Sequence, residues 1–429
     1  MTWASGQLLA AVLFEWLRIG TVRYSGGDGE SADADFRQTL STLYAVTLSM
    51  TAILATVMLL LGLKMQALFW AGFVLFYATA QGAFDGRQAK LRASFENLKF
   101  SMVWMARSVL SFLLAIGAAQ VFGGAFYAVG GLCLSFFIVL LFGSDPRRKW
   151  VRPRSADILF LAKYGFFAAS AGIITYVIPL AARYLLIHMH GSEASAGAVL
   201  SLDIAQKVIM AIGTAANLLM LQPVIRRVAS KQADAKVALG EHLSRMVALM
   251  APVLVGFVYL NSFAAKYFVP PAFNVGYEEI STLAIAAAAL LCIKSFGVDA
   301  LFVIGGKTGL SALSGLFSAI FAVLGWWALY VADALSTSGV MYVLLGSLLS
   351  GLVASLVMAT KFVDLVVPWQ SLLRVGMVAT VATTLAFLLS SSSSEVVHWT
   401  GGFALIAFFV CGYLFVKVDG VSSLLRGRV

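Results

Sequence analysis

Apolar residues run along the chain in stretches of about twenty, and short polar connections separate these stretches. A helix needs about 20 mainly apolar residues to cross a bilayer. Thirteen stretches meet this requirement: residues 4–22, 38–63, 66–86, 98–121, 125–143, 158–187, 195–224, 243–265, 279–304, 308–332, 338–360, 369–391 and 398–417. The pattern therefore predicts an all-α, polytopic transmembrane helical bundle.

Two kinds of stretch depart from a simple span. The first stretch is weak because it contains Glu15 and Arg18. The stretches at 158–187 and 195–224 are longer than one crossing, so we expect them to tilt or to project beyond the bilayer. No connection is long enough for a soluble catalytic domain.

Composition supports a membrane protein. Hydrophobic residues make up 61% of the chain and charged residues 12%, whereas soluble domains have roughly 45–50% and about 25%. The formal charge is +10, which in a soluble protein would suggest nucleic acid. In a membrane protein it indicates positive-inside loops and some buried cations, so we expect no nucleic-acid partner.

Basic residues gather in every second connection. One set includes clusters within 87–99, 144–157 and 226–245, while the other set holds only Lys64 and Lys266. Lys and Arg concentrate in cytoplasmic loops, which predicts a cytoplasmic C-terminus. Thirteen spans would then place the N-terminus outside, although MTWASGQLL lacks the basic start of a leader. We expect that a first helix is missing; the alternative is a twelve-span protein whose first segment lies on the membrane surface.

The most polar internal segment is SDPRRKWVRPRSAD, residues 144–157. It predicts a basic cytoplasmic linker between an N-terminal helical lobe at 1–143, with five spans, and a C-terminal lobe at 158–429, with eight. An ordinary basic loop is the alternative interpretation.

Motifs of enzyme and metal chemistry are not found in the sequence. The three cysteines lie in apolar runs without CxxC spacing, and the four histidines are scattered. There is no Walker A sequence, no GxSxG turn and no large loop rich in His or Arg. We therefore expect no metal, no cofactor and no enzymatic activity.

Charged residues inside the spans are the candidate functional residues, because a buried charge usually faces a cavity or a partner. Glu15 and Arg18 are three residues apart and share a helix face; they form an ion pair, or Arg18 and the nearby Arg23 face a cavity and attract an anion. Arg107 lies mid-span with no acid within one turn, which favours a cavity. Asp85, followed by Arg87 and Lys90, suggests an interfacial charge cluster.

Two further groups of charges lie in the second half of the chain. Arg183 ends one long stretch, and Asp203 and Lys207 begin the next. Asp203 can pair with Lys207 at i,i+4 or with Arg183 across the hairpin. Lys294 and Asp299 are five apart and do not share a face of an α-helix, so each is expected to have a partner elsewhere.

Buried cations outnumber buried acids. Arg offers phosphate a bidentate fork, so a cationic cavity suits an anionic substrate. The candidate substrate-binding cations are Arg18, Arg23, Arg107, Arg183, Lys207 and Lys294, and the candidate coupling or ion-pair residues are Glu15, Asp203 and Asp299.

The ordered set of motifs resembles the Wzx-like polysaccharide flippases of the multidrug/oligosaccharidyl-lipid/polysaccharide (MOP) exporter superfamily. The segments that carry the resemblance are FEWLRIGTVRY at 14–24 with RQTL at 37–40, AARYLLIHMHGSEASAGAVLSLDIAQK at 181–207, YFVPPAFNVGYEE at 267–279 and VPWQSLLRVGMVA at 367–379. The resemblance implies a fourteen-helix bundle with lobes of six and eight, of which this chain lacks the first helix. Ala182 departs from the acid that often precedes the Arg-Tyr pair, which leaves Asp203 as the expected partner of Arg183.

The resemblance further implies a flippase in the bacterial inner membrane. Its cargo would be an undecaprenyl-pyrophosphate-linked oligosaccharide for exopolysaccharide or lipopolysaccharide O-antigen synthesis, and its partners a glycan polymerase and glycosyltransferases. A proton or sodium gradient would drive transport through Asp203 or Asp299. The alternatives are a cation-coupled drug or small-molecule exporter, which suits a less cationic cavity, and a glycan polymerase or ligase, which needs a catalytic loop.

Overall fold

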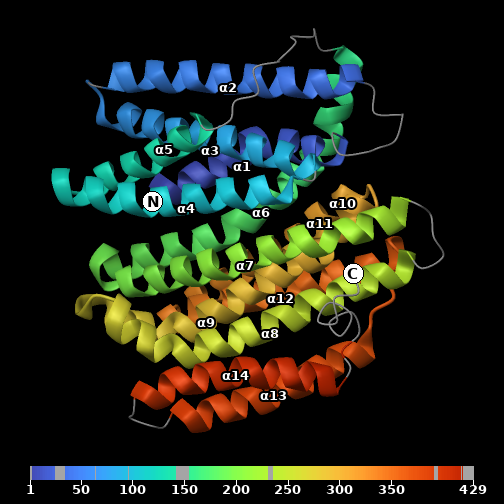
Figure 1. The fold of residues 1–429 in the computed structure, drawn as a ribbon. Coiled ribbons are helices and arrows are strands. Elements are labelled where there is room, and N and C mark those ends of the chain that lie inside the picture. Colours follow the sequence, from blue (N-terminus) through green and yellow to red (C-terminus); the bar gives the residue numbers. More distant parts are fainter. Residues whose placement is uncertain are drawn as a thin grey trace. The chain divides into compact units, whose positions relative to one another are not determined.

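The computed structural model describes residues 2–24, 34–62, 64–94, 96–141, 154–229, 235–390, 395–416 and 418. The elements in these ranges are all helices (Figure 1), and each predicted span coincides with a helical segment. Within the described ranges, ten helices are long and apolar enough to cross a membrane, and Phe126–Leu141 and Thr400–Phe415 are shorter apolar helices. The prediction of an all-α transmembrane bundle is confirmed.

Contacts between Cα atoms divide the chain into two compact units, Met1–Val177 (unit 1) and Ile178–Val429 (unit 2). The division falls inside α6 (Ser155–Ala194), close to Pro179. Most of the basic segment 144–157 lies outside the described residues, so the assignment of a cytoplasmic linker there stays a prediction.

Unit 1 is built around one central helix. Its helices are α1 (Thr2–Tyr24), α2 (Ala34–Gly62), α3 (Gln66–Ala93), α4 (Asn97–Phe122), α5 (Ala125–Leu141) and the first part of α6. Helix α3 packs against α1, α2, α4 and α5. It can do so because it is rich in Gly and Ala, which let neighbouring helices approach closely.

Two glycines of α3 show how close this packing is. A Cβ atom at Gly82 would lie 2.5 and 2.6 Å from carbons of the Phe14 ring, and one at Gly86 would lie 2.5 Å from the Tyr44 ring. Tyr44 Oη donates a 2.7 Å hydrogen bond to the carbonyl of Gly82. The two glycines therefore allow α1 and α2 to dock on α3 and place the polar residues of α1 beside those of α3.

Unit 2 contains the rest of α6 and the helices that follow it. These are α7 (Ala196–Ala229), α8 (Ala235–Phe268), η1 (Pro271–Phe273), α9 (Asn274–Cys292), η2 (Ile293–Val298), α10 (Asp299–Ile304), α11 (Thr308–Val331), α12 (Thr337–Phe362), α13 (Trp369–Ser390) and α14 (Glu395–Phe415). The alanine-rich α9 packs against α7, α8 and α12, while α13 and α14 lie side by side and pack on α8 (Figure 1).

Two local features lie where one helix ends and the next begins. The long helix α6 contains Gly191, which has a φ of 78° and ends the regular helix before α7 begins. This positive φ favours glycine because it has no Cβ. At the start of α4, Lys99 Nζ lies 2.5 Å from Oε2 of Glu96, the residue before the helix. This hydrogen bond holds the pKa of the Glu96 carboxyl below its usual value.

Candidate functional site

The polar residues of α1 form an ion pair. Arg18 Nε donates a 2.8 Å hydrogen bond to Glu15 Oε2, and its Nη2 bonds the other carboxylate oxygen. The three-residue spacing places both side chains on one face of α1, which confirms the predicted pair. The carboxylate takes up two of the five donors of Arg18 and compensates its charge.

A small cavity in unit 1 opens beside this pair. Its lining comes from α1, α3 and α6: Gln7, Ala10, Ala11, Phe14, Glu15, Arg18, Gln81, Asp85 and Tyr176. Glu15 and Arg18 therefore face a cavity as well as each other, and the attraction of an anion by Arg18 and Arg23 stays a prediction. The side chain of Arg23 lies outside the described residues.

Asp85 brings a second carboxyl group to this cavity. It hydrogen bonds with Gln81 one helical turn earlier, and Arg18, Glu15 and Arg107 are near enough to act on its charge. The sequence grouped Asp85 with Arg87 and Lys90 at the interface. In the structure, Arg87 instead donates a 2.6 Å hydrogen bond to the carbonyl of Val139, and the carboxyl of Asp85 lines the cavity.

Arg107 lies on α4 against two aromatic rings. Its guanidinium carbon is 4.4 Å from the centre of the Phe136 ring and 5.6 Å from that of Phe84. Aromatic faces stabilise a cation that has left water. Within the described part of the chain, Arg107 Nε is buried and has no hydrogen-bond partner, so this group keeps unused capacity for an acceptor.

Arg183 and Asp203 meet across the hairpin of α6 and α7. Arg183 Nη2 lies 2.7 Å from Asp203 Oδ1 in an ion pair and donates a 2.7 Å hydrogen bond to Gln206 Oε1. The expected pairing of Arg183 with Asp203 is confirmed. Lys207 is exposed one turn further along α7.

Lys294 and Asp299 pair with each other, so the prediction of separate partners was wrong. Lys294 Nζ lies 2.5 Å from Asp299 Oδ2. The reason is local: residues Ile293–Val298 form a π-helix, in which hydrogen bonds join residues five apart. This wider turn brings the two side chains onto one face, which an α-helix would not do.

These charges form separate groups, each within its own unit. Unit 1 holds Glu15, Arg18, Asp85 and Arg107, and unit 2 holds the pairs Arg183–Asp203 and Lys294–Asp299. Among the described residues, no group of three or more His, Cys, Asp or Glu side chains could hold a metal ion. The chemistry available in unit 1 is recognition of anions and hydrogen-bond donors in a nonpolar setting.

Four polar lining residues were not singled out from the sequence as site residues: Gln81, Asp85, Gln7 and Tyr176. The signal for the first two was present, since Gln81 and Asp85 are four residues apart and share a face of α3. Tyr176 comes from α6, nearly a hundred residues away in sequence, and no local pattern could connect it with α3.

No protein-family model and no curated protein matches this sequence. Solved structures match its fold. The lipid II flippase MurJ, in an inward closed conformation, aligns with 99% of this chain and 93% of its own at a TM-score of 0.60 and 14% identity. An outward-facing multidrug resistance MATE family transporter of the MOP superfamily aligns with 83% of this chain and 85% of its own at a TM-score of 0.59 and 15% identity.

This chain has the MOP transporter fold. A further MOP superfamily transporter, from Pyrococcus furiosus, aligns with 83% of this chain and 82% of its own at a TM-score of 0.52 and 16% identity. The MOP resemblance inferred from the sequence motifs is thus confirmed at the level of the fold. Identities of 14–16% carry no information about which residues bind a substrate.

Proposed function

We propose that this protein is a flippase that moves a lipid-linked oligosaccharide across the bacterial inner membrane. The cargo class is an undecaprenyl-pyrophosphate-linked oligosaccharide for exopolysaccharide or lipopolysaccharide O-antigen synthesis. A glycan polymerase and glycosyltransferases of the same pathway would act with it. The fold supports a membrane transporter, and the solved structures of this fold include a lipid II flippase and multidrug transporters.

The observation that carries the choice of an anionic cargo is Arg107. Most charged groups inside the spans are neutralised by a neighbour, as Arg18 is by Glu15 and Arg183 by Asp203. Arg107 instead lies over the Phe84 and Phe136 rings without an ion pair among the described residues, and its buried Nε, like that of Arg183, has no hydrogen-bond partner there. A planar guanidinium with free donors suits phosphate oxygens.

The drug exporter is the second candidate, because multidrug transporters share the fold. A cationic drug would be repelled by Arg107 and attracted by Asp85, so the two candidates predict opposite roles for these residues. The enzyme alternative has less support, since the solved structures with this fold are transporters.

The test is a flipping assay with purified protein in proteoliposomes. A fluorescent undecaprenyl-pyrophosphate-linked oligosaccharide is placed in both leaflets, and its accessibility to an external glycosidase is followed over time. Wild-type protein should expose the inner-leaflet cargo, and Arg107→Met should slow this by roughly tenfold or more, as expected for the loss of charged hydrogen bonds. Arg107→Lys should retain part of the activity.

Lys163→Met is the matched control, because Lys163 is an exposed cation on α6 and its removal should leave the rate unchanged. Efflux of a cationic dye is measured in the same vesicles. Dye transport without movement of the glycolipid would replace the proposal with the drug exporter. Equal rates for wild type and Arg107→Met would remove Arg107 from the binding site.

A further inference from the structure

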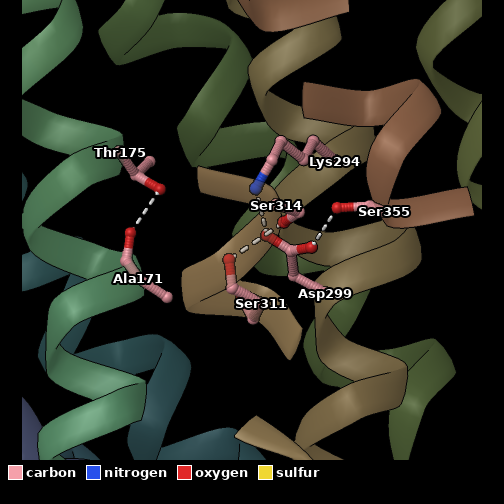
Figure 2. A network of polar contacts seen from close by, with 7 residues as sticks. All are labelled: Ala171, Thr175, Lys294, Asp299, Ser311, Ser314 and Ser355. Carbon is pink, nitrogen blue, oxygen red and sulfur yellow. Dashed lines mark hydrogen bonds and ion pairs between the residues drawn. The ribbon is translucent and has the colours of Figure 1, made fainter. Parts of the chain in front are cut away.

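The pair of Lys294 and Asp299 is the most deeply buried charge pair described in unit 2. Lys294 is 2% exposed and Asp299 is 7% exposed, and Figure 2 shows the ammonium pointing at the carboxylate. A buried ion is costly unless its charge and its hydrogen bonds are satisfied. The residues around this pair therefore indicate which charge this buried cluster is built to hold.

Both oxygens of the carboxylate are engaged. Oδ2 faces Lys294 Nζ, and Oδ1 accepts a 2.8 Å hydrogen bond from Ser355 Oγ on α12 (Figure 2). The π-helix that brings the pair together is fixed from another side, because a ring nitrogen of His242 on α8 lies 2.8 Å from the carbonyl oxygen of Phe296. The carboxylate is thus held in place independently of Lys294.

Other residues around the pair offer further oxygen atoms. Ser314 on α11 lies beside the pair (Figure 2) and donates its own proton to the carbonyl of Ser311, 2.9 Å away, which leaves its oxygen free to accept. Ser318 is 1% exposed, and its Oγ has no partner in the described part of the chain. Ser318 Oγ fills the space left by Gly351, where a Cβ would also lie 3.2 Å from Lys294 Cε.

A buried carboxylate surrounded by hydroxyl groups offers a cation several oxygen ligands and a single negative charge. Alkali ions and ammonium are bound by such oxygens, and a single positive charge completes the balance. We infer that this cluster is a monovalent-cation site whose cation is built into the chain as the ammonium of Lys294. The cluster takes Na⁺, K⁺ or NH₄⁺ when that ammonium is removed.

This inference goes beyond the proposed function and does not depend on the cargo. Because Lys294 supplies the charge permanently, unit 2 keeps Asp299 balanced without taking up an ion from solution. Asp299 is then a structural counter-charge for the π-helix. It does not couple transport to a sodium or proton gradient, which was one of the roles inferred for it from the sequence.

The experiment measures the melting temperature of purified full-length protein in detergent, with chloride salts at constant ionic strength. Lys294→Ala in choline chloride should melt below wild type, because Asp299 is left unpaired. Replacing choline by ammonium or sodium should raise the melting temperature of Lys294→Ala by roughly 3–6 °C. This increase should level off at cation concentrations far above the dissociation constant. Wild type should not distinguish between the salts.

The control is Lys294→Ala/Asp299→Asn, which has the same space but no charge and should not respond to the choice of cation. A Lys294→Ala protein that melts at one temperature in all salts would overturn the inference, as would an equal response of the double variant. If Lys294→Ala does not fold in choline, recovery of folded Lys294→Ala or Lys294→Ser in ammonium or sodium alone supports the inference, and loss of both in every salt contradicts it. None of these melting measurements involves the lipid-linked oligosaccharide, so the flipping assay tests the proposed function separately.

Discussion

At the scale of single residues, the same side chain has a different role according to what surrounds it. Arg18 bonds both oxygens of Glu15 and contributes little free charge, whereas Arg107 rests on aromatic rings and keeps donors unused. The sequence placed both in one class of buried cations. Only the contacts separate a neutralised arginine from one that can still bind an anion.

Gly82 is a residue whose role depends entirely on its neighbour. Gly82→Ala should destabilise the protein by about 1–3 kcal/mol, because the new methyl group overlaps the buried Phe14 ring. Gly130→Ala is the control, since nothing lies within 4 Å of a Cβ there and alanine favours the helix. Unfolding by SDS in mixed micelles measures both, and equal stabilities of the two variants would refute the proposed packing of α1 on α3.

At the scale of elements, hydrogen-bond register decides which residues meet. The π-helix Ile293–Val298 joins Lys294 to Asp299 at a spacing of five, and the hairpin of α6 and α7 joins Arg183 to Asp203 over twenty residues. In both cases a charge within the membrane region is compensated inside its own unit.

Deleting Ser295 should keep the lysine–aspartate pair. The deletion removes the extra residue of the π-helix, and the two side chains become i,i+4 neighbours on an ordinary α-helix. The exchange Val298→Asp/Asp299→Val should break the pair, because the carboxylate then leaves the position where Ser355 binds it and takes the place of the buried Val298. We expect the deletion variant to melt above the exchange variant, and the opposite order would contradict the π-helical register.

Arg183 and Asp203 should be energetically coupled. Arg183→Ala and Asp203→Ala each remove the 2.7 Å contact, so the double variant should lose less stability than the sum of the single variants. The expected coupling is about 1–3 kcal/mol for a contacting pair of this kind, measured by SDS unfolding. Additive losses would show that the pair contributes nothing to the hairpin.

At the scale of the whole molecule, the distribution of basic residues predicts one orientation in the membrane. The connection between α3 and α4 should face the cytoplasm, and the one between α6 and α7 should face outward. The test uses single-cysteine variants in a background with Cys133, Cys292 and Cys411 replaced.

In right-side-out vesicles, an impermeant maleimide should label Ser192→Cys and leave Ser94→Cys unlabelled. Both residues are exposed at the ends of helices, so burial does not limit labelling. After the membrane is permeabilised, both variants should react. Labelling of Ser94→Cys alone in intact vesicles would reverse the orientation and with it the cytoplasmic C-terminus.

The sequence by itself determined the spans, the membrane environment and the pairings that follow α-helical periodicity. Twenty-residue apolar stretches leave a bilayer helix as the stable choice, since backbone polar groups must be satisfied internally. The Glu15–Arg18 pair follows from a spacing of three, and the partner of Arg183 could be inferred from the hairpin and from the departure at Ala182.

The tertiary structure alone decided which distant residues share a cavity and where the helix changes its register. Asp85 and Tyr176 line one cavity with residues of α1, and Gly82 and Gly86 let α1 and α2 approach α3. Such close packing depends on side-chain shapes from several helices at once. The single π-turn at Ile293–Val298 is invisible to α-helical periodicity. Its stability rests on His242 and Ser355, contributed by two other helices, and for that reason the pairing of Lys294 with Asp299 could not be predicted from local sequence.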